Sequence, residues 1–280
     1  MSRLRYRSIA FIGIIALAYA VSLNAQDAQN LSDPEKLSEE QKRDFLLNAK
    51  VVHSKRIGKG ITNPYQLALS DGNITHDASF QSVDIYKASE KFDNGRTEMN
   101  FRDSYKYNIA AFELAKLLGL DDMVPVTVER KWNGKRGAVS WWLPTLMTLG
   151  DKVKKKATAP NIEAYNKSMY KVRLFTELVY DTDRSNPGNI LIGKNWELYM
   201  IDFTRAFRLY TTLAEPKNLV MCDRQLLQKL KQLDAAELEQ KTKDWLSGME
   251  IKGIMARRDK IVELFESFIK EKGESQVLYD

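Results

Sequence analysis

The stretch DTDRSNPGNILIGKNWELYMIDF, residues 181–203, decides the fold. It opens with a loop of Asp, Ser, Asn, Pro and Gly, which favour turns, and on composition alone it could be a surface loop that ends a helix. The apolar runs ILIG and WELYMI follow and predict a β-hairpin. Such a hairpin would bring Asn189 and Asp202, thirteen residues apart, to one end of the paired strands. Their oxygens suit a hard cation, so the pattern indicates a site for Mg²⁺ or Mn²⁺.

The composition predicts a folded protein. The chain has 280 residues, of which 44% are hydrophobic and 29% charged, so a sizeable core can form. Cys222 is its single cysteine, which excludes an intrachain disulfide. The two histidines, His53 and His76, lie apart and give no zinc signature. A Gly-x-Ser-x-Gly motif is absent, so nothing indicates a serine hydrolase.

Residues 1–25 have the layout of a signal peptide. Three arginines in MSRLRYR precede the apolar run SIAFIGIIALAYAVSL, which is short for a membrane span. We therefore expect an exported protein, periplasmic or secreted, with no membrane span after cleavage; an uncleaved N-terminal anchor is the alternative. Removal of this segment leaves 40 basic and 37 acidic residues, so the charge gives no case for nucleic-acid binding.

The patterns after the signal predict an α+β protein with two lobes. A polar helical extension covers 26–50, with an N-cap at Ser32 or Asp33, and a β-rich lobe with one helix covers 51–143. In this lobe YQLALS and ASFQSVDIY read as a hairpin. The helix DSYKYNIAAFELAKLLG begins with Asp103 or Ser104 as N-cap and ends at Gly119. The strands MVPVTVER and RGAVSWWL follow.

Helical patterns dominate residues 144–280. They cover 161–180, which starts at Asn161, and about 223–246 and 250–272. The lysine cluster DKVKKK at 151–156 predicts a solvated loop between the lobes, or else a contact with an acidic substrate or lipid. The 181–203 hairpin lies at the junction of the two lobes.

The order DR, GNILI and IDF resembles the catalytic segment of the protein-kinase-like superfamily. The resemblance is to its atypical branches: phosphatidylinositol 3- and 4-kinases, HipA-like kinases and the secretory-pathway (Golgi) casein kinases. The segment NIAAFELAKLLGLDDMVPVTVER also looks like the helix and strand of the secretory-pathway kinases. The resemblance covers roughly residues 56–210 and implies a bilobal kinase-like fold.

The resemblance implies roles for particular residues. Asp183 would be the catalytic carboxylate, and Asn189 and Asp202 would bind the metal ions. Gly58 and Gly60 would let the backbone of a glycine-rich loop approach the phosphates of ATP. The segment WWLPTL would join the lobes, where Trp141 or Trp142 lines an adenine pocket or belongs to the core.

The sequence departs from the family pattern in the catalytic loop. Five residues separate Asp183 from Asn189 where four are usual, whereas Asp181 and Asn186 have the usual spacing. We favour Asp183, because Arg184 follows it as in the lipid-kinase branch and because Asn189 leads directly into the strand.

A second departure concerns the nucleotide-binding lobe. Gln81 stands where the phosphate-binding lysine is expected, and Asn108 where its glutamate partner is expected. A Gln–Asn pair can still hydrogen-bond and keep the helix docked, but it lacks the cation. Neither Lys87 nor Glu113 is placed to replace them. Charge could instead come from Lys106, Glu98 or Arg102 near the helix start.

Two functions follow as expectations. The first is an ATP- and metal-dependent phosphotransferase whose acceptor is an unknown protein, lipid, sugar or other small molecule. The second is a pseudokinase-like binding or regulatory module that has lost the charged pair. We expect Arg205, in IDFTRAF, to pair with a nearby carboxylate rather than to act in catalysis.

Overall fold

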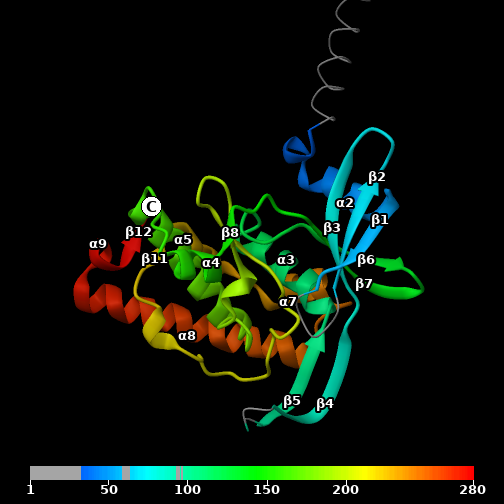
Figure 1. Ribbon diagram of the computed structural model, residues 1–280. Helices are drawn as coiled ribbons and strands as arrows, with labels where there is room; N and C mark the ends of the chain where they lie inside the picture. The colour runs from blue at the N-terminus through cyan, green and yellow to red at the C-terminus, as the bar shows by residue number, and fades with distance from the viewer. Residues whose placement is uncertain (1–32, 59–63, 93–94, 96) are drawn as a thin grey trace, which may run out of the picture.

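The computed structural model describes residues 33–58, 64–92, 95 and 97–280. The predicted signal peptide, Ser32 and Gly60 lie outside these residues. Figure 1 shows a β-rich part beside a helical part, as the sequence predicts. The first half contains η1 Pro34–Lys36, α2 Glu39–Asn48, β1 Lys50–Arg56, β2 Tyr65–Ser70, β3 Thr75–Gln81, β4 Asp84–Lys91, β5 Thr97–Ser104, α3 Lys106–Leu118, β6 Thr127–Trp132 and β7 Lys135–Trp141.

The second half is mainly helical, with short strands and 3₁₀ turns. It contains β8 Met147–Thr148, α4 Leu149–Lys155, α5 Ile162–Val179, η2 Pro187–Asn189, β9 Ile190–Ile192, β10 Leu198–Met200, η3 Pro216–Asn218, β11 Cys222–Asp223, α6 Arg224–Gln232, α7 Ala235–Thr242, α8 Gly248–Lys272, α9 Glu274–Val277 and β12 Leu278–Tyr279. No helix within the described ranges is long and apolar enough to cross a membrane.

A five-stranded antiparallel sheet forms the first lobe, in the order β1-β2-β3-β7-β6. Alternate side chains point to opposite faces of a strand. On one face Leu67, Ala78, Phe80 and Val139 are buried, and they pack with Leu46 of α2. Helix α2 starts with a capping box at Ser38 and makes its own contacts with β6 and β7. The other face of the sheet is turned toward α3 and the helical lobe.

The prediction of one continuous strand over ASFQSVDIY is wrong, because residues 82–83 separate two different strands. Strand β3 ends at Gln81, and β4 pairs with β5 to form a separate hairpin of two strands. Gln81, the last residue of β3, is paired with Ala138 of β7, and the chain leaves the sheet after it. In Figure 1 this hairpin projects away from the five-stranded sheet, and it was not predicted. Lys87 consequently lies on the hairpin and not on β3.

The predicted cap of α3 is also wrong. Asp103 and Ser104 are the last residues of β5, and the helix begins at Lys106 after Tyr105, which makes no side-chain cap. The Ser104 hydroxyl donates to Asp84 at 2.8 Å. The helix ends at Gly119, as predicted, and this glycine has the left-handed φ of 67° that favours it as a helix stop.

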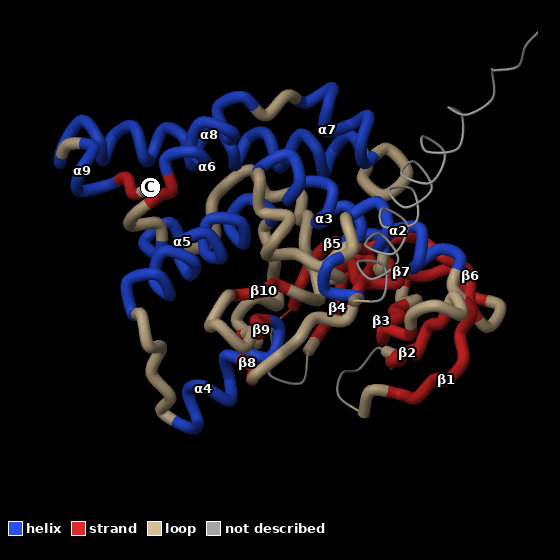
Figure 2. The backbone as a smooth tube through the Cα atoms, turned by 90° about the horizontal axis from the view of Figure 1, so that it is seen from above, coloured by secondary structure: helices blue, strands red, loops and turns tan. Residues whose placement is uncertain are grey.

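The helical lobe is built around α5 and α8, which pack against each other (Figure 2). The side chain of Asn161 caps α5, so the helix begins where the sequence predicts it. The pattern at 223–246 proves to be two helices, because Asp234 caps a new helix after Leu233. Residues 151–155 of DKVKKK belong to α4 rather than to a loop, since Thr148 and Asp151 form a capping box, although most of the cluster is exposed as expected.

Candidate functional site

The loop after α5 is held by a buried ion pair between Asp181 and Arg184. The side chains are 0% and 6% exposed. The Arg184 guanidinium donates to the carboxylate of Asp181, and also to the backbone oxygens of Asn189 at 2.9 Å and Ile201 at 3.0 Å. Asp181 also accepts from the amide of Asp183 at 2.9 Å. Arg184 therefore ties the loop to the residues immediately before β9 and after β10.

Asp183 and Asn189 are in direct contact. The side-chain amide of Asn189 donates to Oδ2 of Asp183 at 2.9 Å, and Asn189 is buried. Asn186, the partner of Asp181 in the other register, instead caps η2 by accepting from the amide of Gly188 at 3.0 Å. The extra residue in the loop is thus absorbed by a 3₁₀ turn that ends at Asn189. The structure brings Asp183, and not Asp181, to the side chain of this asparagine.

The predicted hairpin is confirmed and places Asp202 beside this loop. Strands β9 and β10 pair antiparallel, with Ile190 opposite Met200. The amide of Ile201 donates to the carbonyl of Asn189 at 3.0 Å, so the chain leaves the hairpin next to that residue. Asp202 then adopts a left-handed φ of 58°. A non-glycine residue in this region is uncommon, and such strain clusters at functional sites.

Asp202 is half-buried, and its carboxylate accepts two hydrogen bonds. Its Oδ1 accepts from Gln81 at 3.2 Å and from the Thr204 hydroxyl at 3.1 Å. Burial raises the pKa of Asp202, the two hydrogen bonds oppose this change, and the nearby charges of Asp103 and Asp181 add to it. A carboxyl group that is costly to ionise and lies among other acids is a candidate for cation binding.

Gln81 and Asn108 form the predicted neutral pair. The amide of Asn108 donates to Oε1 of Gln81 at 2.6 Å, and its Oδ1 accepts from the backbone amide of Phe203 at 2.7 Å. Together with the bond from Gln81 to Asp202, these contacts connect β3, α3 and the segment that follows β10. The pair therefore links α3 to β3 without supplying a charge.

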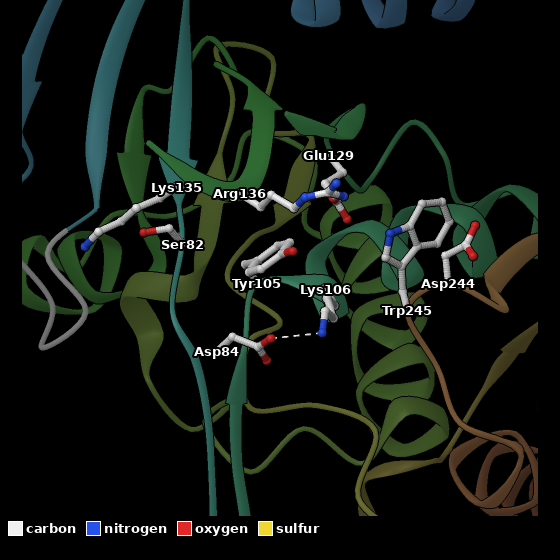
Figure 3. A pocket seen from close by; sticks show the side chains of 9 residues that line it. All are labelled: Ser82, Asp84, Tyr105, Lys106, Glu129, Lys135, Arg136, Asp244 and Trp245. Atoms are coloured by element: carbon white, nitrogen blue, oxygen red, sulfur yellow. Dashed lines mark hydrogen bonds and ion pairs between the residues drawn. The ribbon is translucent and has the colours of Figure 1, made fainter. Parts of the chain in front are cut away.

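The other charged groups considered for this role are engaged elsewhere. Lys106 pairs with Asp84 at 2.9 Å, and Figure 3 shows this contact in a pocket beyond the end of β3. Arg102 stacks on Tyr86, with its guanidinium 4.2 Å from the ring centroid. Glu113 pairs with Arg43 at 2.6 Å, on the side of α3 that meets α2. None of these contacts is with Gln81 or Asp202.

Glu98 of β5 anchors the unpredicted hairpin to the segment after Asp202. Its carboxylate is 4% exposed and pairs with Arg205 at 2.6 Å and Arg208 at 2.5 Å. The expectation that Arg205 pairs with a carboxylate is confirmed. The hairpin also brings Asp103, which the sequence had suggested as a helix cap, next to Thr204 and the charge of Asp183. Burial raises the pKa of Asp103.

Asp103 is a residue of the site that the sequence did not reveal. It lies far from residues 181–203 in the chain, and a long-range hairpin contact leaves no local pattern.

The remaining predicted site residues lie in different places. Gly58 follows β1, and a Cβ added there would meet no atom within 4 Å among the described residues. Trp141 packs on the α2 side of the sheet against Phe45 and the ring of His76, so it belongs to the core and does not line the cleft. Trp142 follows Trp141 directly, so alternation along the chain places it on the other face of the sheet. It is half-buried where the chain leaves β7.

The oxygen atoms of Asp202 and Asn189 suit a divalent cation that also binds phosphate. Both hydrogen bonds to Asp202 fall on Oδ1, and among the described residues none is found on Oδ2. Asn189 uses its amide nitrogen toward Asp183, so a cation would have to be bound through its side-chain carbonyl oxygen. The described part of the chain contains no group of three or more Asp, Glu, His or Cys side chains placed around one ion. Mg²⁺ commonly uses one or two carboxylates and completes its shell with water and substrate phosphates.

The fold is that of protein-kinase-like proteins. A structure of hydra Fam20 with sugar superposes with a TM-score of 0.64 at 14% identity, over 88% of this chain and 93% of that one. The Golgi casein kinase gives 0.59 at 13% identity, over 88% and 79%. The Helicobacter pylori proinflammatory kinase CtkA gives 0.50 at 12% identity, over 81% and 97%. No protein-family model and no curated protein matches the sequence.

Proposed function

We propose that this kinase-like protein binds a nucleoside triphosphate, ATP in the first instance, with Mg²⁺ or Mn²⁺ and transfers its terminal phosphoryl group to a hydroxyl. The observation that carries the proposal is the half-buried Asp202, which the bond from Ile201 to Asn189 holds beside the Asp183–Asn189 pair. Burying an ionised carboxylate next to other acids is costly unless a cation accompanies it. A metal–nucleotide complex supplies that cation.

Each residue has a role that its contacts allow. Asp202 and Asn189 would hold the metal ion, which when bound neutralises charge on the phosphates. The Asp183 carboxylate would orient the acceptor hydroxyl and accept its proton, while Asn189 fixes one of its oxygens at 2.9 Å. Arg184 does not act on the phosphates in this scheme, because its guanidinium is committed to Asp181 and to backbone oxygens.

The first experiment tests for the metal–nucleotide complex. Thermal shift of the full chain with MnCl₂ and ATP should show stabilisation that neither component gives alone. Asp202→Ala should abolish this shift, whereas Asp244→Asn, which removes an exposed carboxylate outside the site, should retain it. If the intact protein shows no nucleotide- or metal-dependent shift, the proposal is wrong.

The second candidate function is a regulatory module that binds the nucleotide without transferring phosphate. It is favoured by the neutral contacts of Gln81 with Asn108 and Asp202 at the position of the phosphate-binding lysine. Phosphoryl transfer from [γ-³²P]ATP to casein, to lipid extracts or to water distinguishes the two. Transfer that is lost in Asp183→Asn supports the enzyme; a Mn²⁺–ATP shift without transfer to any acceptor supports the module.

Export is a separate part of the proposal. We propose that residues 1–25 direct the chain to the periplasm or out of the cell, with an uncleaved membrane anchor as the alternative. The mass of the protein recovered from the cell envelope and the medium decides between them, because cleavage removes the N-terminal segment. Recovery of the intact chain from the cytoplasm would contradict export.

A further inference from the structure

A cavity of about 310 Å³ lies between residues 207–210 and the β4–β5 hairpin, which projects from the sheet in Figure 1. We call this cavity the hairpin pocket. The hairpin supplies Tyr86, Met99 and Arg102 to its lining, and Glu250, from the first turn of α8, joins residues 207–210 in lining the rest. The volume is near the lower end of the range for ligand pockets, roughly 300–1,000 Å³, so it suits a few side chains of a partner rather than a large cofactor.

The conformation of Asn100 brings two side chains of β5 to the same pocket. Residues three apart on a regular strand face opposite sides, yet Met99 and Arg102 both line the cavity. Between them Asn100 has a left-handed φ of 52°, and the ladder of β4 and β5 pairs the residues on either side of Asn100 but not Asn100 itself. This conformation is uncommon for a residue other than glycine, and such strain clusters at functional sites. The hairpin therefore departs from regular geometry at the point where it forms the pocket.

Apolar side chains around the pocket are open to water. Tyr86, Met99, Leu209 and Tyr210 are between 40% and 60% exposed, and they come from three separate segments of the chain. Single exposed apolar residues are normal, whereas a group of them around a cavity is typical of an interaction surface. Because the fold leaves these side chains uncovered, a partner that covers them would gain hydrophobic free energy.

The backbone of residues 207–210 is held in place by a buried arginine. The guanidinium of Arg257 donates to the carbonyl of Arg208 at 2.9 Å and to that of Tyr210. It also donates to the carbonyl of Leu178 at 2.8 Å, which ties the segment to the end of α5. The apolar surface is therefore preformed, and a partner would lose little affinity to the ordering of this segment.

Arg102 supplies a positive charge at the pocket. Its guanidinium lies 4.2 Å from the ring centroid of Tyr86, and within the described ranges no carboxylate forms an ion pair with it. The two acids of this region have partners of their own. Glu98 pairs with two other arginines, and Glu250 accepts from the amide and the hydroxyl of Ser247, each at 2.7 Å. Arg102 is consequently available to a carboxylate from outside, which its planar guanidinium can bind through two parallel hydrogen bonds.

We propose that the hairpin pocket docks a partner protein through an extended segment in which an apolar side chain stands next to an aspartate or glutamate. The apolar side chain would fill the pocket between Met99 and Leu209, and the acidic side chain would pair with Arg102. The next residue of β5, Asp103, belongs to the candidate site, so a docked partner would be held close to that site. Docking needs no bound nucleotide, and its test is independent of the proposed phosphoryl transfer.

Selection from a library of random peptides displayed on phage tests the chemistry of the partner. The full chain is the bait, and the enriched peptides are synthesised with a fluorescent label for polarisation measurements. We expect the enriched sequences to share an aromatic or aliphatic residue beside an aspartate or glutamate. Replacing that acid by its amide should weaken binding roughly tenfold, because a charge-assisted hydrogen bond is lost.

Two variants assign the binding to the pocket. Arg102→Gln should weaken binding of the enriched peptides roughly tenfold, and Met99→Ser should do the same by removing apolar contact. The controls are Arg56→Gln, which removes an exposed arginine beside Tyr65 on another hairpin, and Val52→Ser, which removes an exposed apolar side chain of β1. Both controls should bind the peptides like the original protein. The Tm of all four variants should stay close to that of the original protein, because the replaced side chains are exposed.

Each outcome decides for or against this docking surface. Loss of binding in Arg102→Gln and Met99→Ser, with both controls unaffected, supports it. A selection without enriched peptides, or enriched peptides that bind both variants as tightly as the original protein, would overturn it. Two other occupants would overturn it as well. A dimer in sedimentation that Met99→Ser dissociates assigns the surface to a second copy of the chain, and binding to phosphatidylglycerol vesicles that Met99→Ser abolishes assigns it to a membrane.

Discussion

Replacing Glu98 by glutamine should destabilise the protein strongly. The carboxylate of Glu98 is 4% exposed and lies 2.6 Å from Arg205 and 2.5 Å from Arg208, whose side chains are 16% and 4% exposed. Glutamine keeps the shape but removes the charge, which leaves two poorly solvated guanidinium groups without their anion. Removing one partner of a buried ion pair costs about 3–5 kcal/mol. For a chain of this size each kcal/mol lowers Tm by about 2–4 °C, so Tm should fall by about 6 °C or more.

Glu90→Gln is the matched control, because it lies on the same hairpin and also pairs with a cation. Its carboxylate is 29% exposed and lies 2.6 Å from Lys87, which is 48% exposed. An exposed pair contributes about 0.2–1 kcal/mol, so Tm should fall by less than about 4 °C. Thermal unfolding followed by circular dichroism measures both variants. If Glu98→Gln falls no further than Glu90→Gln, the argument from burial is wrong.

Three further changes test the site. Asp202→Asn should stabilise the metal-free protein at neutral pH. The folded protein raises the pKa of Asp202 above its unfolded value of 3.8, so the free energy of unfolding falls as the pH rises from 3.8 through the folded pKa, and asparagine does not titrate. Urea unfolding in EDTA between pH 4 and 7 should therefore show a stability difference between the variant and the original protein that grows with pH. Gln81→Lys places a cation near Asp202 and should tighten the binding of Mn²⁺–ATP measured by calorimetry, although the hydrogen bond from Asn108 is lost. Weaker binding would contradict the view that position 81 contacts the phosphates. Asp181→Asn leaves Arg184 buried without its anion and should cost about 3–5 kcal/mol in urea unfolding, and a neutral result would show that the pair is dispensable.

The part of the site that the sequence predicted is the part whose signals are local. Turn residues, two apolar runs and a final aspartate lie within 23 residues, so the β9–β10 hairpin and the approach of Asp202 to Asn189 follow from neighbouring positions. The sequence favours Asp183 over Asp181 as the catalytic carboxylate, and this assignment stays a prediction. The structure adds the contact of Asp183 with Asn189 and the 3₁₀ turn, neither of which the spacing of the acids reveals.

The β4–β5 hairpin shows where local patterns fail. Seven of the eight residues of β4 are exposed, so this strand lacks the alternation of apolar and polar side chains that marks a half-buried strand. Asp103 and Ser104 then resemble a helix cap because they precede a helical pattern. Trp141 is a different case, since its parity with Val139 could have indicated the α2 side of the sheet.

The anchor at Glu98 also bears on how the two lobes can move. The hairpin connects the end of β3, which carries Gln81, to the start of α3, which carries Asn108. Because Glu98 fixes this hairpin to Arg205 and Arg208, the ion cluster joins the lobes in addition to the chain after Trp142 and the hydrogen bonds of Gln81 and Asn108. A change in the angle between the lobes would have to break or bend several of these connections. We therefore expect the cleft to stay close to one width, with ligands entering an already formed site.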